Sequence, residues 1–475
     1  MLTRLEVQGF KNLLDVTVDF GPFTCIAGAN GIGKSNVFDV IDFLSHLAND
    51  TLIEASQRVR GSSGLRGSDP RDLFWDGYHD HERKITLAAE MIVPAEVEDD
   101  LGAPAKATTT YLRYELALGY ASPEGEGSVG RLVLLREVLR HINRSEAARR
   151  LRFEHNARRF RDAVVIGRRQ GVAYLSTEPR ESGIVINVHG DGGSPGRPQP
   201  RAAGRAGRTV LSTITTNDYP TILAARREMQ SWHRIALEPS ALRAPDGFSD
   251  PRVLAPNGQH LAATLYRIAN EPRPGMPDPD PAAVYARVAG RLSDLSGVGA
   301  ERISVEPDPV REVFTLMLEE KGGLRLPARA LSEGTLRFLA LCVLLEDPTS
   351  QGLICMEEPE NGIHPANLPA MLQLVQDLAV DPSEAPEAGN PFRQVIINTH
   401  SPGVVQLCAP QDLLLAETVP HQTPDGPIAR ALSLLPYTGT WRAAEAGQTF
   451  SEVDVMAYLT GPREAQLRLP LDLVG

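Results

Sequence analysis

The fold is decided by the stretch FTCIAGANGIGKSNVF, which occupies residues 23–38. A short apolar run that is typical of a buried strand stops at Gly28, and apolar residues recur at helical spacing after Gly33. Between strand and helix stand a glycine, four further residues and then Gly-Lys-Ser, a pattern whose backbone N–H groups can surround phosphates. Because strand, loop and helix occur together in this order, the stretch predicts a phosphate-binding loop rather than a glycine-rich turn.

The residues of this loop fit a nucleoside triphosphate. Gly31 and Gly33 let the backbone turn inward, and Lys34 would reach the β- and γ-phosphates. The Ser35 hydroxyl would be a ligand of Mg²⁺. The set expected to contact the nucleotide is Asn30, Gly31, Gly33, Lys34, Ser35 and Asn36.

Composition is that of an ordinary globular protein. The 475 residues are 42% hydrophobic, enough for two or three domains with a large core. Since there is no run of about 18 apolar residues and no long apolar segment at the N-terminus, we expect a cytosolic protein without a membrane partner. The cysteines lack paired spacing and are expected to be reduced core residues rather than ligands of a structural zinc: Cys25, Cys342, Cys355 and Cys408.

Charge is distributed unevenly in this chain, whose formal net charge is −12. Residues 131–208 carry 17 arginines, no lysine and seven acids, a local balance of +10 that leaves −22 for the remainder. Three interpretations stay open for this region: a solvated arginine-rich surface, a contact to the phosphate backbone of a nucleic acid, or a docking surface for an acidic partner. The arginines considered for a nucleic-acid contact are Arg144, Arg149, Arg150, Arg158 and Arg159.

Residue patterning predicts an α/β protein with a mostly parallel core sheet, an antiparallel β subdomain and an inserted α-rich region. Apolar alternation indicates a hairpin over residues 2–20 and later strands over 84–93, 109–118 and 131–139. The expected parts are an N-terminal lobe (1–140), a basic, partly flexible insertion (141–270) that a proline-rich linker over 272–281 follows, a C-terminal lobe of alternating helices and strands (282–420), and a C-terminal extension (421–475).

Two adjacent carboxylates, Glu357 and Glu358, follow a strand-like apolar run over 352–356. Phosphoryl transfer needs one carboxylate at the tip of such a strand to hold Mg²⁺ and another to orient and polarise the attacking water. We therefore expect Glu357 at the metal and Glu358 at the water. A charged loop edge is the alternative, and the phosphate loop upstream makes it the less favoured one.

Two weaker signals flank this pair. Ser332 opens a helix over 332–345, where it is a natural N-cap, but a helix N-terminus carrying Ser332 and Gly334 is also an anion site able to contact a γ-phosphate. His400 follows a strand over 394–398, where both a structural histidine and a γ-phosphate sensor fit the sequence.

The order of these motifs resembles the ABC-type ATPase heads of the RecF and structural-maintenance-of-chromosomes (SMC) kind, and more closely the OLD-type ATPases of prokaryotic defence loci. The resemblance covers residues 1–49 and 328–417. It implies a P-loop NTPase with ATP and Mg²⁺ as cofactors, in which Ser35 and Glu357 are metal ligands and Glu358 and His400 are catalytic. Residues 28–35 would be Walker A, 331–335 the signature, 361–365 the D-loop and His400 the switch histidine. Glu357 stands where transporter ATPases carry Asp, and Glu333 stands where Gly is commoner.

The resemblance implies an ATP-hydrolysing homodimer or higher oligomer, in which Walker A of one subunit and the signature of another enclose ATP. It also implies an anti-phage defence role, in which this subunit controls a separately encoded nuclease or toxin. A RecF-like repair ATPase that binds DNA ends or gaps is the alternative within the same fold. A self-sufficient nuclease is less favoured, because the residues after His400 lack the carboxylates of two-metal cleavage. A transporter subunit is less favoured because of the large basic insertion.

Overall fold

The computed structural model describes most of the chain: residues 1–59, 69–75, 83–122, 130–167, 169, 171–181, 183–192, 197–272, 278–294, 299–422 and 428–460. It forms two compact units. The first comprises Met1–His233, Asp381–Pro386 and Ala409–Gly475, and the second comprises Arg234–Val380 and Glu387–Cys408. The border after His233 falls inside the segment expected to be an insertion, and the four-part division made from the sequence stays a prediction.

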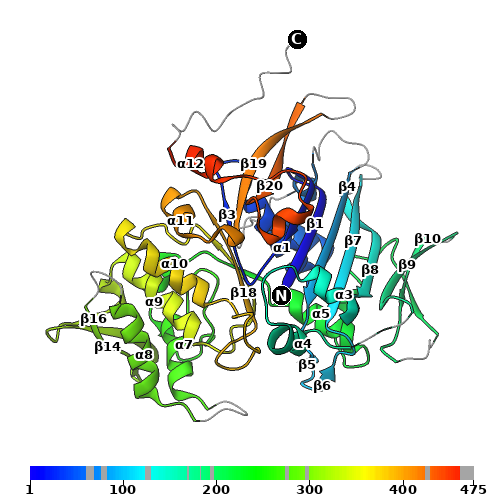
Figure 1. Ribbon diagram of the computed structural model, residues 1–475. Coiled ribbons are helices and arrows are strands. Elements are labelled where there is room, and N and C mark those ends of the chain that lie inside the picture. The colour runs from blue at the N-terminus through cyan, green and yellow to red at the C-terminus, as the bar shows by residue number, and fades with distance from the viewer. Residues whose placement is uncertain are drawn as a thin grey trace. The chain divides into compact units, whose positions relative to one another are not determined.

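The first unit contains an eight-stranded antiparallel sheet with the order β11-β10-β9-β8-β7-β4-β1-β2 (Figure 1). Polar and apolar residues alternate in β2, so Val16 and Val18 are buried while Asp15 and Thr17 are exposed. The strands are β1 (Leu2–Phe10), β2 (Leu13–Asp19), β4 (Lys84–Ile92), β7 (Tyr111–Ala121), β8 (Arg131–His141), β9 (Leu175–Arg180), β10 (Gly183–Val188) and β11 (Gln199–Ala202).

A second group of strands in this unit carries the phosphate loop. Strand β3 (Phe23–Ala27) is wholly buried and pairs in parallel with β19 (Leu413–Gln422), which pairs antiparallel with β20 (Ile428–Pro436). A short hairpin joins β5 (Glu96–Glu98) to β6 (Pro104–Lys106). The helices are α1 (Ser35–Leu47), α2 (Leu52–Arg58), α3 (Arg144–Arg150), α4 (Asp162–Val164), α5 (Pro220–Gln230) and α12 (Glu452–Thr460), with shorter turns at Pro70–Leu73, Ala157–Arg161, Leu211–Thr213, Pro410–Asp412 and Trp441–Glu445.

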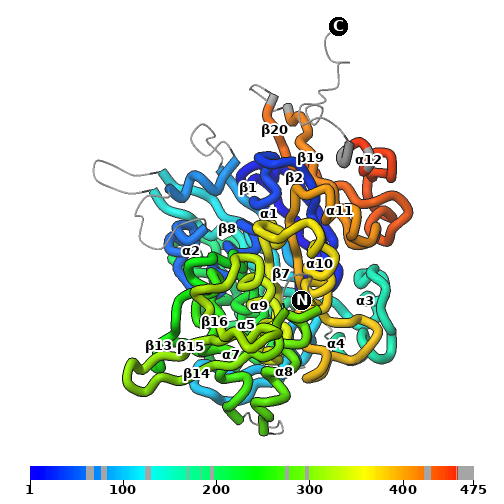
Figure 2. The backbone as a smooth tube through the Cα atoms, turned by 90° about the vertical axis from the view of Figure 1, so that its left-hand side faces the viewer, coloured from blue at the N-terminus to red at the C-terminus, as the bar shows by residue number. Residues whose placement is uncertain are grey.

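The second unit holds the parallel pair of β17 (Gly352–Glu357) and β18 (Arg393–Thr399), accompanied by α9 (Glu333–Glu346), α10 (Leu368–Asp377) and α11 (Pro402–Leu407). Beside it, β15 (Val313–Glu320) pairs antiparallel with β13 (Asp246–Gly247), β14 (Ala300–Asp308) and β16 (Arg325–Pro327). Helices α7 (Leu261–Asn270) and α8 (Pro281–Ser293) pack on this small sheet (Figure 2). Short segments complete the unit: α6 (Pro239–Leu242), Ala328–Ala330 and Pro365–Asn367, while β12 (His233–Ile235) spans the border.

Comparison with the sequence expectations confirms the α/β fold, with its parallel pairs and an antiparallel sheet. The four cysteines are free and buried. The expected insertion has helical segments over 144–150 and 157–164 and in its last part, but its middle contributes three strands, β9, β10 and β11. Within this insertion, which was expected to be partly flexible, Gln199 and Pro200 belong to β11, and residues 193–196 lie outside the described part. Residues 273–277 of the expected linker and 423–427 and 461–475 of the expected extension also lie outside it.

Glu137 ties the large sheet to a distant segment of the chain. Its side chain is fully buried in β8, and its two carboxylate oxygens accept hydrogen bonds from the backbone N–H groups of Val210 (2.7 Å) and Leu211 (2.8 Å) and from the Tyr114 hydroxyl (3.1 Å). Burial raises the pKa of Glu137 from its ordinary value of 4.5 to about 7. The folded chain therefore keeps this proton over a range in which the unfolded chain releases it.

The pH dependence of stability follows from that difference. Between about pH 4.5 and 7 the folded state binds more protons than the unfolded state, so the free energy of unfolding should fall as pH rises. Glu137→Gln lacks this titration. Denaturant unfolding at several pH values should show the wild-type chain losing up to about 3 kcal/mol relative to the variant across this window.

A matched control is Glu6→Gln. The hydrogen bond from Arg113 lowers the pKa of Glu6 to about 2, below the window, so the difference between wild type and Glu6→Gln should change there by less than about 0.5 kcal/mol. Parallel stability curves for wild type and Glu137→Gln would contradict the assignment of Glu137 as the titrating group.

Candidate functional site

The phosphate loop follows β3 in the first unit, and its glycines meet different steric demands. Gly31 and Gly33 have φ angles of +81° and +97°, in the left-handed region that favours glycine. A Cβ on Gly33 would lie 2.2 Å from the Asn12 Nδ2 atom, whereas a Cβ on Gly31 would have no heavy atom within 4 Å. A Cβ on Gly28 would lie 2.8 Å from the backbone oxygen of Ala416 in β19. The phosphate loop is therefore tightly packed at Gly28 and Gly33 and open at Gly31.

Lys34 is held across this loop. Its buried Nζ atom donates hydrogen bonds to the backbone oxygens of Gly28 (2.7 Å) and Ala29 (2.8 Å). Ser35 and Asn36, in the first turn of α1, are half-buried. A helix N-terminus next to a held cation can bind an anion, because its N–H groups and dipole favour negative charge.

Asn12, in the turn between β1 and β2, supports the loop from outside. Its Nδ2 atom donates to the backbone oxygen of Ile32 (2.9 Å), its Oδ1 atom accepts a bond from Asn36 Nδ2, and its own backbone oxygen accepts one from Leu432 N (2.9 Å). Sequence analysis missed this residue, because its role depends on a contact between distant segments. A Cβ atom added at Gly33 would collide with this same Asn12 side chain.

The acidic pair lies at the end of β17 in the second unit. The parallel register sets Glu357 opposite Asn398 of β18, and the backbone N–H of Glu358 donates to the Asn398 side chain (3.1 Å) and backbone oxygen (3.0 Å). Glu358 has a φ of +45°, which is uncommon for a residue with a side chain. The strand therefore ends in a sharp turn that Asn398 holds in place.

Two polar side chains position the Glu358 carboxylate. His400 Nδ1 lies 2.7 Å from Glu358 Oε1, and Asn361 Nδ2 donates to Oε2 (2.7 Å). The Glu358 side chain is 27% exposed, so the carboxylate is held and still reachable by solvent. The structure thus places the two residues expected to be catalytic, Glu358 and His400, in contact, and their catalytic roles stay predictions.

Glu357 and Glu360 have different surroundings. Arg234 NH1 contacts Glu357 Oε1 at 3.1 Å, an ion pair that sequence analysis missed because Arg234 lies more than a hundred residues earlier. Glu360 is buried and accepts a hydrogen bond from the Thr399 hydroxyl. Burial raises its pKa, and nearby Glu358 adds to that rise. Of the three acids, Glu358 is the one that two polar side chains, His400 and Asn361, contact at a half-buried position.

The helix α9 begins at the expected signature. Ser332 is its N-cap, with the Oγ atom accepting a hydrogen bond from Thr335 N at 3.2 Å. A Cβ on Gly334 would lie 3.3 Å from the backbone oxygen of Gly362, and one on Gly362 would lie 3.0 Å from Glu333 Oε1. The start of α9 thus lies against the turn that follows Glu358. Capping accounts for Ser332 locally, and its contact with a nucleotide stays a prediction.

The arginines considered for a nucleic-acid contact divide into two groups. Ion pairs occupy three of them: Arg144 with Asp162, Arg150 with Glu90 and Glu146, and Arg159 with Glu384. All five are exposed, Arg149 and Arg158 among them. A cavity of about 1110 Å³ in the first unit is lined by Arg149 and Arg150, but altogether by six arginines and six carboxylates, so these charges balance. In the described part of the chain, no helix is long and apolar enough to span a bilayer.

The chain is similar to several known proteins. RecF, the DNA replication and repair protein of Phocaeicola vulgatus, is 34% identical over 61 residues, which are 13% of this chain and 16% of that protein. The match thus spans about a sixth of its length. The SMC head domain from Thermotoga maritima is 12% identical, with a TM-score of 0.34 over 92% of this chain and 98% of that one. An SMC head bound to the C-winged helix domain of ScpA is 14% identical, with a TM-score of 0.40 over 91% and 97%.

A family match identifies the class of protein. Residues 23–105 and 207–406, more than half of the chain, match one family. Together with the RecF match, it confirms the expected class, an ABC-type ATPase head of the RecF and SMC kind. The chain belongs to the family described as "AAA domain, putative AbiEii toxin, Type IV TA system". The unmatched residues 106–206 contain β7 to β11 of the large sheet.

Two glycine variants test how the phosphate loop is packed. Gly33→Ala would place a methyl group against Asn12 at a left-handed φ, whereas Gly31→Ala meets the same backbone restriction in open space. We expect Gly31→Ala to lower the free energy of unfolding by about 1–2 kcal/mol and Gly33→Ala by clearly more. Thermal unfolding without nucleotide measures both, and equal losses would contradict the role of Asn12.

Proposed function

We propose that this chain binds Mg²⁺-ATP at its phosphate loop and hydrolyses it in a homodimer. The observation that carries the proposal is the fixed carboxylate of Glu358, held by His400 and Asn361 at the end of a buried strand, in a chain that also has a preformed phosphate loop. Family membership supports the coarser part, a nucleotide-binding ATPase domain. The residue types that the phosphate loop and the acidic pair need for this chemistry are all present in the chain.

The residues present fit a magnesium nucleotide. Lys34 supplies a cation over the loop, and the open space at Gly31 leaves the loop accessible. Ser35 and Glu357 would hold Mg²⁺, since hydroxyl and carboxylate oxygens are its preferred ligands, and the ion would supply charge neutralisation at the phosphates. Arg234 contacts one oxygen of Glu357, which orients the carboxylate.

Glu358 is proposed as the general base. Its carboxylate orients a water molecule and accepts a proton as the water oxygen bonds to the γ-phosphorus, while the bond from that phosphorus to the β,γ-bridging oxygen breaks and leaves ADP. His400 and Asn361 fix the carboxylate oxygens, which lowers the entropy that positioning costs. The His400 ring is also proposed as a contact to the γ-phosphate.

The proposal of a dimer rests on the N-terminal end of α9. Ser332 and Gly334 open a 14-residue helix whose N-terminus can bind an anion. In an ABC-type head this end would face the nucleotide of the partner subunit, so ATP joins two subunits and hydrolysis releases them. The packing of Gly334 against Gly362 would couple this contact to the turn that follows Glu358.

Replacing Glu358 with Gln tests the base. The variant should still bind Mg²⁺-ATP but hydrolyse it at least about 10²-fold more slowly, because the positioned proton acceptor is lost. The ATP-bound dimer should then persist, which light scattering with and without ATP would show as an increase in mass. Lys34→Ala is the matched control, since it should lose nucleotide binding itself and stay monomeric with ATP. Wild-type hydrolysis by Glu358→Gln would exclude the proposed role.

The biological role proposed is control of a separately encoded nuclease or toxin in anti-phage defence. The support is the family description, which names a putative AbiEii toxin of a type IV toxin-antitoxin system. The RecF match favours a second candidate, a repair ATPase that binds DNA ends or gaps. For that candidate the exposed Arg149 and Arg158 are the nucleic-acid contacts to consider, because Arg144, Arg150 and Arg159 are engaged with acids.

Phage and DNA-damage challenge separate the two roles. Cells that express this gene with its native neighbours should resist phage infection, and Lys34→Ala should abolish the resistance, while survival after ultraviolet irradiation should not change. The native protein should also co-purify with the product of a neighbouring gene. Protection against irradiation without protection against phage would instead support the repair role.

A further inference from the structure

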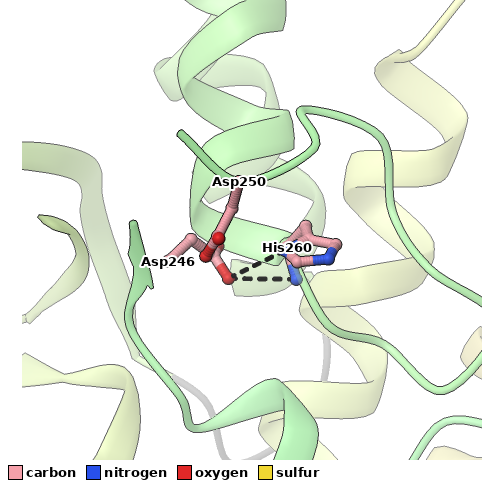
Figure 3. A group of neighbouring side chains, drawn as sticks. All are labelled: Asp246, Asp250 and His260. Atoms are coloured by element: carbon pink, nitrogen blue, oxygen red, sulfur yellow. Dashed lines mark hydrogen bonds and ion pairs between the residues drawn. The ribbon is translucent and has the colours of Figure 1, made fainter. Parts of the chain in front are cut away.

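Three side chains able to bind a metal converge in the second unit, outside all the motifs described above. They are Asp246, Asp250 and His260, and one ligand atom from each lies within 4.8 Å of the others. Figure 3 shows the two carboxylates side by side, with the imidazole of His260 next to Asp246. All three residues lie in the segment from β13 to the start of α7.

Backbone hydrogen bonds orient both carboxylates. Asp246 is buried in β13, where its Oδ1 atom accepts from His260 N (3.0 Å) and its Oδ2 atom accepts from Ala263 N (2.9 Å). Asp250 Oδ2 accepts from Gly247 N (2.7 Å). Since each carboxylate oxygen has two lone pairs, these bonds leave acceptor positions for a cation while they fix the direction of each carboxylate.

His260 has an uncommon backbone conformation and a buried ring nitrogen that forms no hydrogen bond with the described residues. Its backbone has a φ of +67°, which is uncommon for a residue other than glycine, and this conformation sets the imidazole beside Asp246. The Nδ1 atom is shielded from solvent and forms no hydrogen bond with the described residues. It lies 3.5 Å from Asp246 Oδ1, too far for a good hydrogen bond. A buried nitrogen in this state is costly unless something else binds it.

We propose that Asp246, Asp250 and His260 bind one divalent transition-metal ion. Two ligands on a tetrahedral ion at about 2.1 Å lie about 3.4 Å apart, close to the 3.5 Å between His260 Nδ1 and Asp246 Oδ1. One imidazole with two carboxylates suits Zn²⁺ or Mn²⁺, whereas Mg²⁺ prefers oxygen ligands alone. The ion would also neutralise two neighbouring carboxylates that otherwise repel each other.

The ion would act as a structural clip. It would join β13, the turn at Asp250 and the N-cap of α7, so its binding should stabilise the second unit against unfolding. With three protein ligands, at least one position remains for water. An ion pair between Asp246 and a protonated His260 is the competing explanation of the cluster, and it predicts no response to metal.

Metal titration of the full-length chain tests the site without nucleotide or hydrolysis. After chelator treatment, wild-type protein should bind one Co²⁺ per chain with visible absorption bands, and Zn²⁺ should displace it and raise the melting temperature. His260→Asn keeps a side chain that tolerates the left-handed backbone, and Asp250→Asn keeps an acceptor for Gly247 N. Each should weaken Co²⁺ and Zn²⁺ binding by about 100-fold or more.

His189→Gln is the control, because His189 bonds Ser176 in the first unit and should not affect the titration. Wild-type protein that binds neither ion, or Asp250→Asn and His260→Asn that bind both as tightly as wild type, would overturn the proposal. If His260→Asn fails to fold, Asp250→Asn alone decides between these outcomes. Because no step involves ATP, this result is independent of the proposed hydrolysis.

Discussion

The pairing of β17 with β18 is the constraint on which the chemistry of the second unit depends. Their parallel register sets Asn398 beside Glu357, and from there Asn398 binds the backbone N–H of Glu358 and stabilises its left-handed conformation. The turn that results brings His400 to the Glu358 carboxylate. A one-residue shift of this register would reverse the faces of the strand and separate all of these groups.

In the first unit, the phosphate loop must likewise be held in one backbone conformation. A phosphate loop needs glycines for its backbone shape, and glycine-rich segments are the ones that lose most conformational entropy on folding. Asn12 and Lys34 offset that cost by bonding the loop at Ile32, Gly28 and Ala29. The loop is therefore ordered by its own chain before any phosphate arrives, which lowers the cost of binding one.

The fold was predictable from the sequence wherever a local pattern carried it. Alternation identified the hairpin of β1 and β2, and the phosphate loop and the acidic pair identified the two chemical motifs with their strands. The strands β9, β10 and β11 were missed because none has an alternation to detect: β11 is exposed along its whole length, β9 is buried chiefly at Leu175, and β10 is buried in one continuous run at its end. Asn12 and Arg234 were missed because long-range contacts define them, and single positions carry no such signal.

The left-handed backbone at Glu358 has a consequence for how this protein could change. Glycine or asparagine adopts that conformation more easily than glutamate, so the residue proposed to carry the reaction is not the one that the turn favours. At this position, glycine or asparagine would favour the stability of the fold, whereas glutamate is the residue proposed to favour ATP hydrolysis. Selection of variants for heat resistance alone would tend to remove the Glu358 carboxylate. A heat-tolerant relative with glycine at this position would be a candidate for a chain that still binds nucleotide but no longer hydrolyses it.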